Sequence, residues 1–145
     1  MSVTVKKITL WRGTVENRPG ALAEVLEPVA AEGTDLQVVM GYREPGEKLR
    51  AAVELFPVKG RKLTEAVEGA GLVPSSIPTV LVTGANRAGL GHAIARTLAN
   101  AGINLTFLVA MVAGRNYSAV LGFERDADAG QAIRLIKKAV SGRPR

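Results

Sequence analysis

The chain has 145 residues, of which 47% are hydrophobic and 22% charged, a composition typical of a globular protein and not of a disordered one. It contains no cysteine, which excludes disulfide bonds and thiolate metal sites, and no apolar run approaches the roughly 20 residues that span a bilayer. The start of the chain also lacks a signal peptide pattern, so we expect a soluble, cytoplasmic protein.

The formal net charge is +6 and the isoelectric point is near 10.1, a balance that can indicate nucleic-acid binding. The basic residues, however, occur as single residues and as pairs such as Lys6-Lys7 and Lys137-Lys138, without a long basic run. This dispersion favours a solvated basic surface over a nucleic-acid-binding face.

The first half of the chain reads as strand, helix, two strands, helix and strand. β-Branched and apolar residues over 4–12 predict a strand, and Pro19 then suits the first turn of a helix. Apolar residues at helical spacing continue until Gly33, although Pro28 inside that run predicts a kinked or shortened helix. The later segments predict strands over 36–42 and 49–56, a helix over 62–70 and a short strand over 72–74.

The second half repeats this order but stops one strand short. Its segments predict a strand over 79–83, a helix over 90–101, strands over 103–113 and 117–124, and a helix over 128–140. The chain then ends at SGRPR, so no segment remains for a last strand. We expect the N-terminal stretch Val3-Thr4-Val5 to take that place beside the second half.

The two halves also share residues at fixed positions. An offset of 69 residues aligns Asn17 with Asn86 and gives seven identities over residues 14–36 without a gap. Ordinary residue frequencies would give about one or two by chance. The sequence therefore contains an internal repeat, whose common feature is Asn-Arg-x-Gly at the turn from the first strand into the first helix.

These elements predict an α+β fold of two ferredoxin-like βαββαβ repeats, each with an antiparallel sheet and helices on one face. The repeats are residues 1–74 and 75–145, the second apparently without its own last strand. A domain of about 70 residues is marginally stable alone, and exposed sheet edges invite pairing. We therefore expect the two sheets to pack side by side and the chain to form a homodimer.

The stretch VTGANRAGLGHAIAR over 82–96 is similar to the glycine-rich turn of a nucleotide-binding dehydrogenase. In short-chain dehydrogenases that turn reads T-G-x-x-x-G-x-G, whereas Thr83-Gly84 is followed by Gly89 and Gly91, one residue too far away. No Tyr-x-x-x-Lys pair is present, and the about 65 residues that follow are too few for a dinucleotide-binding sheet. We therefore expect no dinucleotide and no other cofactor.

The repeated turn has the chemistry of a small-anion site. The first amides of a helix have no internal partner and carry a partial positive charge, so a carboxylate or phosphate fits there. A glycine lets a ligand approach the backbone, and an asparagine both donates and accepts hydrogen bonds. We expect Asp35 and Asn104, at the start of the next strands, to return to the same end of the fold. The structural alternative is that Asn17 and Asn86 only cap their helices.

The segment ENRPGALAEVLEPVAAEGTDL resembles the first helix of an ACT domain, a small regulatory module that binds amino acids. The regulatory domain of phosphoglycerate dehydrogenases has a similar H-E-N-R-P-G-x-L turn, and NRAGLGHAIARTLANAGINL resembles the same element. The resemblance covers nearly the whole chain, because both segments lie in the expected element order. It implies a free-standing tandem ACT protein with ligands held at interfaces between adjacent repeats.

The resemblance also implies ligand-binding residues in each repeat. The family's histidine falls on Val15 and Gly84, so serine specificity does not carry over. The family's two asparagines and its backbone donors at the helix start match these positions: Asn17, Asp35, Gly20, Ala21 and Leu22 in the first repeat, and Asn86, Asn104, Gly89, Leu90 and Gly91 in the second.

No catalytic constellation accompanies these turns. His92 is the only histidine, which excludes a histidine metal cluster and leaves no Ser-His-Asp set to argue from. We therefore expect a non-catalytic sensor, without metal or cofactor, that binds an amino acid or a similar small zwitterion.

Two other functions stay open. RNA-recognition modules use the same ferredoxin-like plan and stack bases on strand aromatics, but Tyr117, Phe123 and Phe56 lack the required spacing. Nucleic acid is accordingly an improbable partner, and RNA binding is the second hypothesis. The third is an interaction module whose sheet edges pair with an enzyme subunit.

Overall fold

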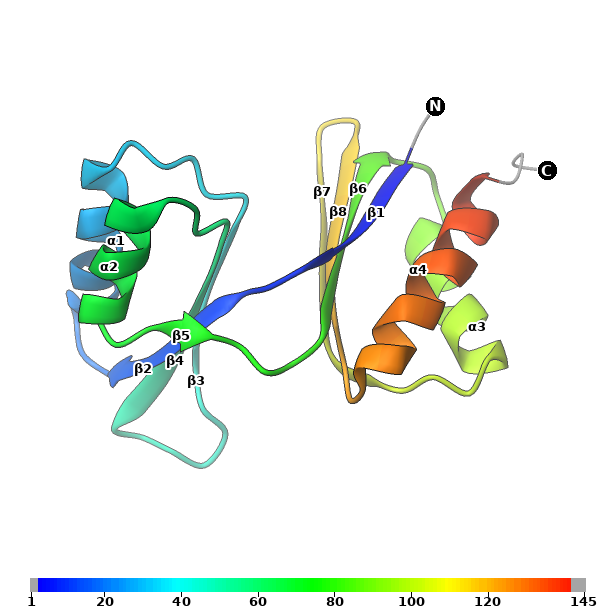
Figure 1. Cartoon of the computed structure of the whole chain (residues 1–145). Coiled ribbons are helices and arrows are strands. Elements are labelled where there is room, and N and C mark those ends of the chain that lie inside the picture. Colours follow the sequence, from blue (N-terminus) through cyan, green and yellow to red (C-terminus); the bar gives the residue numbers. More distant parts are fainter. Residues whose placement is uncertain (1–2, 142–145) are drawn as a thin grey trace. The chain divides into compact units, whose positions relative to one another are not determined.

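The computed structural model describes residues 3–141, in which eight strands and four helices follow the predicted order (Figure 1). The four residues 142–145 of the SGRPR end lie outside the described range. The elements are β1 Val3–Ile8, β2 Trp11–Glu16, α1 Ala21–Ala31, β3 Val38–Arg43, β4 Arg50–Phe56, α2 Arg61–Gly69, β5 Val73–Pro74, β6 Thr79–Ala85, α3 Leu90–Asn100, β7 Leu105–Ala113, β8 Asn116–Phe123 and α4 Asp126–Ser141.

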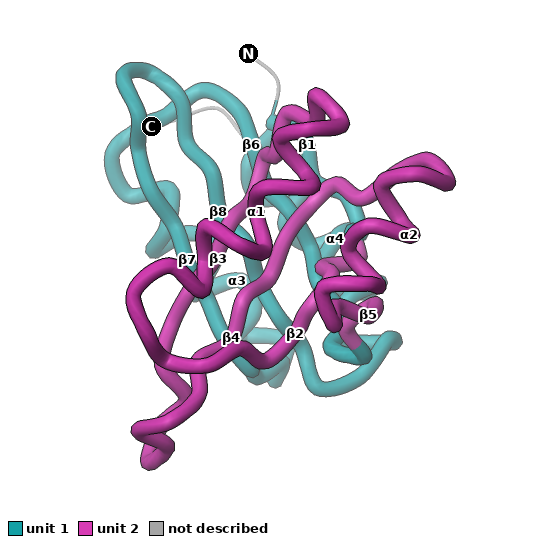
Figure 2. Tube along the Cα trace, turned by 90° about the vertical axis from the view of Figure 1, so that its left-hand side faces the viewer, with its two compact units in different colours: residues 1–8, 76–145 teal, residues 9–75 magenta. Residues whose placement is uncertain are grey.

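The chain folds into two compact units. Unit 1 comprises residues 1–8 and 76–145, and unit 2 comprises residues 9–75 (Figure 2). Unit 2 holds the body of the first repeat, and unit 1 holds the second repeat together with β1. The chain therefore begins in unit 1, leaves it after β1 and returns before β6.

In unit 2 an antiparallel sheet of order β3-β4-β2-β5 has α1 and α2 on one face (Figure 1). Apolar residues spaced four apart in each helix, such as Val25 and Val29, form the stripe that meets alternate residues of the strands. Burying this stripe is the main stabilising contribution to the unit. The buried core consists of Val25, Val29, Val53, Leu55, Leu63, Val67 and Leu72.

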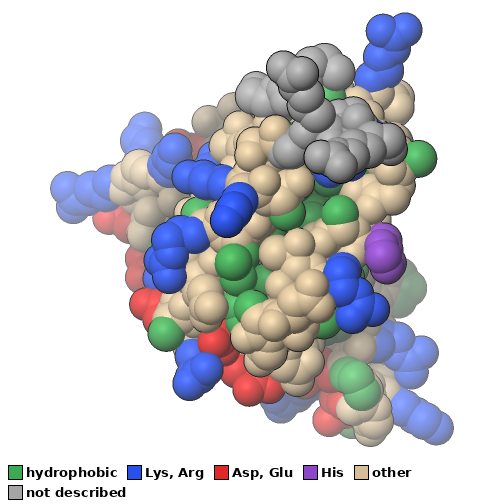
Figure 3. All heavy atoms as spheres, turned by 90° about the vertical axis from the view of Figure 1, so that its right-hand side faces the viewer, with side chains coloured by type: hydrophobic (Ala, Val, Ile, Leu, Met, Phe, Trp, Pro, Cys, Tyr) green, Lys and Arg blue, Asp and Glu red, His purple; other side chains and the backbone are tan. Residues whose placement is uncertain are grey.

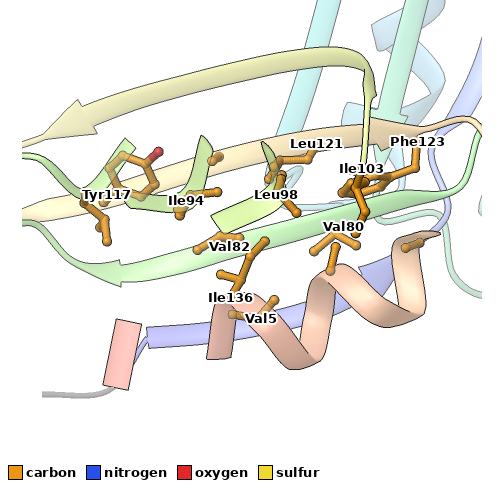
Figure 4. Packing of buried hydrophobic residues seen from close by; sticks show 14 residues of the cluster. Val5, Val80, Val82, Ile94, Leu98, Ile103, Tyr117, Leu121, Phe123 and Ile136 are labelled. Carbon is orange, nitrogen blue, oxygen red and sulfur yellow. The ribbon is translucent and has the colours of Figure 1, made fainter. Parts of the chain in front are cut away.

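Unit 1 repeats this plan with the order β1-β6-β8-β7, and α3 and α4 cover one face of the antiparallel sheet (Figure 1). Its core is larger and includes Ile94 and Leu98 of α3, Ile136 of α4 and Phe123 of β8 (Figure 4). The predicted fold class is thereby confirmed: α+β, with two ferredoxin-like arrangements whose helices lie on one face of each antiparallel sheet.

The expected single strand over 4–12 is wrong, because the structure divides it into β1 and β2 in different units. β1 pairs antiparallel with β6, from Val3 opposite Gly84 to Ile8 opposite Thr79, whereas β2 pairs with β4 and β5. Strand propensity is high throughout this stretch and does not reveal where the pairing partner changes. The prediction that the N-terminal stretch replaces the missing last strand of the second half is confirmed.

Both first helices end in the same way, which extends the repeat from sequence to structure. Gly33 has a φ of 69° and Gly102 a φ of 71°, a left-handed conformation that a side chain would strain. The amide that follows each glycine bonds back into its helix, from Thr34 to Val29 and from Ile103 to Leu98. α1 remains helical through Pro28 and ends three residues later, shortened before Gly33.

No helix in the described part of the chain is long and apolar enough to cross a membrane.

The dependence of unit 1 on β1 can be tested at Val5, whose side chain is buried in the unit 1 core. Val5→Ala removes two buried carbons and is expected to lower the free energy of unfolding by about 2 kcal/mol. The matched control Thr4→Ala, an exposed position of the same strand, should change it by less than about 0.5 kcal/mol. Urea denaturation measures both, and equal midpoints for the two variants would contradict the role of β1.

Candidate functional site

The two repeated turns have the same backbone geometry. Gly20 and Gly89 precede α1 and α3 with φ of 91° and 83°, and neither helix start has a side-chain cap. In each turn the arginine carbonyl accepts the first helical amide at 3.3 Å, from Ala21 to Arg18 and likewise in the second copy. The glycine carbonyl accepts the fourth amide, as from Glu24 to Gly20 at 3.0 Å.

The second and third amides of each helix have no acceptor among the described residues. These amides belong to Leu22 and Ala23 in α1 and to Gly91 and His92 in α3. Unpaired amides at a helix start attract an anion. Since no described side chain caps either helix, these backbone donors are unpaired in both units.

The two asparagines fix the turns to the neighbouring hairpins. The Asn17 backbone amide donates to the Leu49 carbonyl at 2.9 Å, and its Nδ2 donates to the Lys48 carbonyl at 2.9 Å. The Asn86 backbone amide donates in the same way to the Arg115 carbonyl at 2.8 Å. Neither side chain caps its helix, so the simple capping alternative is wrong. Asn17 also lines the pocket described next.

Arg18 lies in ion pairs at the rim. Its Nε is 3.0 Å from Glu16 Oε2, and its guanidinium also contacts Glu24 at 2.5 Å. The hydrogen bonds to Glu24 and to Glu16 raise the pKa of Arg18 above its ordinary value. All three side chains are well exposed, so these pairs add little to stability and mainly hold Arg18 beside the start of α1.

Unit 2 has a pocket of about 230 Å³ between the start of α1 and the β3–β4 edge. Gly41 faces it from β3, since a Cβ added there would meet the Leu22 side chain at 3.8 Å. A second hollow of about 310 Å³ shares Arg18 with it. The pocket is lined by Val15, Glu16, Asn17, Arg18, Ala21, Leu22, Gly41, Tyr42, Arg43, Ala51, Ala52 and Val53.

Arg43 is one of the pocket residues that the sequence did not indicate. It alternates with Tyr42 on β3, so it shares the helix-facing side of the strand with Gly41. No ion pair joins Arg43 to another residue of the described range. No local sequence pattern indicated that Arg43 belongs to the site, because Arg43 reaches the pocket through its pairing with Ala51 on the neighbouring strand.

In unit 1 the corresponding place is occupied by Tyr117. This side chain is 6% exposed and packs beside Ile94 in the core (Figure 4). A Cβ added to Gly91 would lie 3.5 Å from the Tyr117 hydroxyl, so the phenol reaches the start of α3. Burial raises the pKa of Tyr117, which keeps its hydroxyl neutral.

The expectation that Asp35 and Asn104 return to the helix starts is wrong within each unit. Asp35 precedes β3 where Val38 pairs with Phe56, whereas the start of α1 lies at the opposite end of that sheet. Asn104 lies beside Glu124, with 3.4 Å between Nδ2 and Oε1. An 11-residue helix separates these ends by about 16 Å, which local composition does not reveal.

The other sheet face of unit 2 carries polar contacts. The Tyr42 hydroxyl donates to Glu54 Oε2 at 2.7 Å, and Arg12 pairs with Glu44 at 2.7 Å. Burial, followed by the hydrogen bond to Glu54, raises the pKa of Tyr42. Because Tyr42 donates to Glu54, its hydroxyl lies on the face opposite the helices, although other atoms of Tyr42 line the pocket.

Two of the three aromatic residues considered for RNA stacking are buried. Phe123 and Tyr117 lie in the unit 1 core on the helix side of the sheet, where a base cannot reach them. On the face in Figure 3, lysine and arginine side chains are spread between hydrophobic and acidic groups. In the described residues, no group of three or more His, Cys, Asp or Glu side chains could hold a metal ion.

Comparison with solved structures finds the same fold. A protein from Bacteroides thetaiotaomicron superposes with a TM-score of 0.72 at 14% identity, covering 90% of this chain and 88% of its own. The ligand-free regulatory subunit of aspartate kinase from Thermus thermophilus gives 0.65 at 17% identity, covering 96% and 97%. The regulatory subunit from Thermus flavus gives 0.59 at 16% identity, covering 97% of each chain.

No protein-family model matches the sequence, and no curated protein matches it. The identities to the solved structures are low, so the likeness concerns the fold and not the ligand or the partner. Over almost its whole length, the chain has the fold of these aspartate kinase regulatory subunits.

Proposed function

We propose that this protein is a non-catalytic regulatory sensor that binds an amino acid, or a similar small zwitterion, at the turn between the first strand and the first helix of a repeat. The observation that carries the proposal is the pocket of about 230 Å³ beside α1, where unpaired backbone amides and Arg43 face an apolar wall. We expect the protein to act in the cytoplasm and without a cofactor.

The charges around the pocket suit both ends of a zwitterion. The unpaired amide of Leu22, together with Arg43, would hold a carboxylate. An ammonium group would find Glu16, whose Oε1 accepts no hydrogen bond from a described residue, and the Asn17 carbonyl oxygen. Apolar neighbours such as Val15 leave room for a side chain without a charge.

Two further findings support a regulatory role. The segments at the two turns resemble the first helix of ACT domains, and the fold matches regulatory subunits of aspartate kinase along nearly the whole chain. Those neighbours are regulatory subunits of an enzyme, and we infer that this chain likewise regulates a separate catalytic protein.

A thermal-shift screen against the twenty amino acids tests the proposal. A ligand at 100 times its dissociation constant should stabilise the protein by about 2.7 kcal/mol and raise the melting temperature accordingly. The amide of the same amino acid, which lacks the carboxylate, should give little or no shift.

Arg43→Ala should reduce that shift, because it removes the cation that faces the carboxylate. The control Arg61→Ala changes an exposed arginine of α2 in the same unit and should leave the shift unchanged. Absence of any shift in melting temperature with all twenty amino acids would refute the proposal. An equal shift in the two variants would show that the ligand binds at another site.

We also propose that β7 mediates homodimer formation. β7 is an edge strand whose nine residues, LTFLVAMVA, include no charge, and its large side chains are exposed on both faces. Leu108, Val109, Met111 and Val112 are 48%, 48%, 65% and 52% exposed. An unprotected apolar edge of this length favours antiparallel pairing with a second copy, since the same residues then serve both sides.

The double variant Leu108→Lys/Met111→Lys places one charge on each face of β7 and should convert the dimer to a monomer. Ala95→Lys, on the exposed side of α3, is the control and should remain dimeric. Light scattering after size exclusion measures both. A monomeric wild-type chain would contradict the dimer. If wild type instead pairs through β7 with an enzyme subunit, the interaction-module hypothesis takes its place.

A further inference from the structure

We propose that only unit 2 binds the ligand, and that Tyr117 closes the equivalent position in unit 1. The inference rests on the proposed function and narrows it: the chain has two copies of the turn but one working pocket. Its ligand class is the aliphatic amino acids, held by Arg43 and by small apolar neighbours.

Strand register defines which residues of the two units are equivalent. Val15 pairs with Ala51 across β2 and β4, and Gly84 pairs with Tyr117 across β6 and β8. The offset that aligns the two repeats places Val15 on Gly84. Tyr117 therefore stands where unit 2 has Ala51.

The same alignment places Leu22 on Gly91 and Arg43 on Val112. Arg43 of β3 pairs with Ala51 of β4, and Val112 of β7 pairs in the same way with Tyr117 of β8. Four positions around the helix start thus differ in size or charge between the units: Val15 and Gly84, Leu22 and Gly91, Arg43 and Val112, and Ala51 and Tyr117.

The size differences are complementary. In unit 1 the large phenol of Tyr117 lies against Gly91, which has no side chain to obstruct it. In unit 2 the small Ala51 leaves a space that Leu22 does not fill, and that space is part of the pocket. In a close-packed protein the same space cannot hold both a phenol ring and a ligand. The Tyr117 ring therefore excludes a ligand from the start of α3.

The charge difference acts in the same direction. Arg43 gives the unit 2 pocket a cation without an internal partner, whereas Val112 gives unit 1 an apolar, exposed side chain. A carboxylate that left water for the start of α3 would meet no cation from β7. Solvation therefore favours binding at unit 2 alone.

The lining indicates which amino acids fit. The apolar part of the pocket surface, including Val15, Leu22, Ala51 and Val53, offers contacts to an aliphatic side chain, while polar lining residues such as Glu16 and Asn17 remain for the ammonium group. A polar side chain would lose its water without a replacement there. L-Valine, L-leucine and L-isoleucine are the probes that follow from this chemistry.

Titration calorimetry of the full chain with these three probes measures the number of sites. We expect one site per chain, and no binding of isobutylamine, which is valine without its carboxylate. Two equal sites per chain would overturn the inference and leave the proposed function standing. No heat with any of the twenty amino acids would instead overturn the proposed function itself.

Exchange of the differing residues provides the decisive variants. Leu22→Gly/Arg43→Val/Ala51→Tyr gives unit 2 the unit 1 residues at three of these four positions and should weaken binding at least tenfold. Gly91→Leu/Val112→Arg/Tyr117→Ala does the reverse and should add a second site. Circular dichroism confirms that each variant is folded. If the second variant fails to fold, the first still decides, because unchanged binding in it would contradict the inference.

Discussion

The turn from strand into helix leaves the second and third helical amides without acceptors among the described residues, and the candidate site depends on this constraint. In both turns a glycine with positive φ makes the reversal possible, and no side chain caps the helix. Gly20 and Gly89 therefore allow the turn, and neither has a side chain that could cap the amides. Asn17 and Asn86 hold the turn in place by binding the neighbouring hairpin.

What surrounds the amides then decides whether a ligand can reach them. The residue opposite the end of the first strand is Ala51 in one unit and Tyr117 in the other. Because interiors are close-packed, a ring at this position occupies the volume that an alanine leaves open. Both copies thus keep unpaired backbone amides at the helix start, while the cross-strand residue beside them is small in unit 2 and large in unit 1.

The two units do not divide the strands as the sequence repeats would suggest. β1 precedes the first repeat in sequence but completes the sheet of the second by pairing with β6. Val5 contributes directly to that core, so residues 76–145 lack part of the unit to which they belong. Covering the outer edge of β6 also leaves β7 and β1 as the edges of this sheet, and β7 is the long apolar one.

The amino-acid sequence by itself determined the order of helices and strands, the repeat and the glycine turns, because periodicity and glycine conformation are local properties. It also indicated that Val3–Val5 complete the second half. Only the tertiary structure decided that the strand over 4–12 divides between units, that Asp35 lies far from Asn17, and that Arg43 and Tyr117 reach the helix starts. Each of these depends on register between residues distant along the chain, which no local pattern encodes.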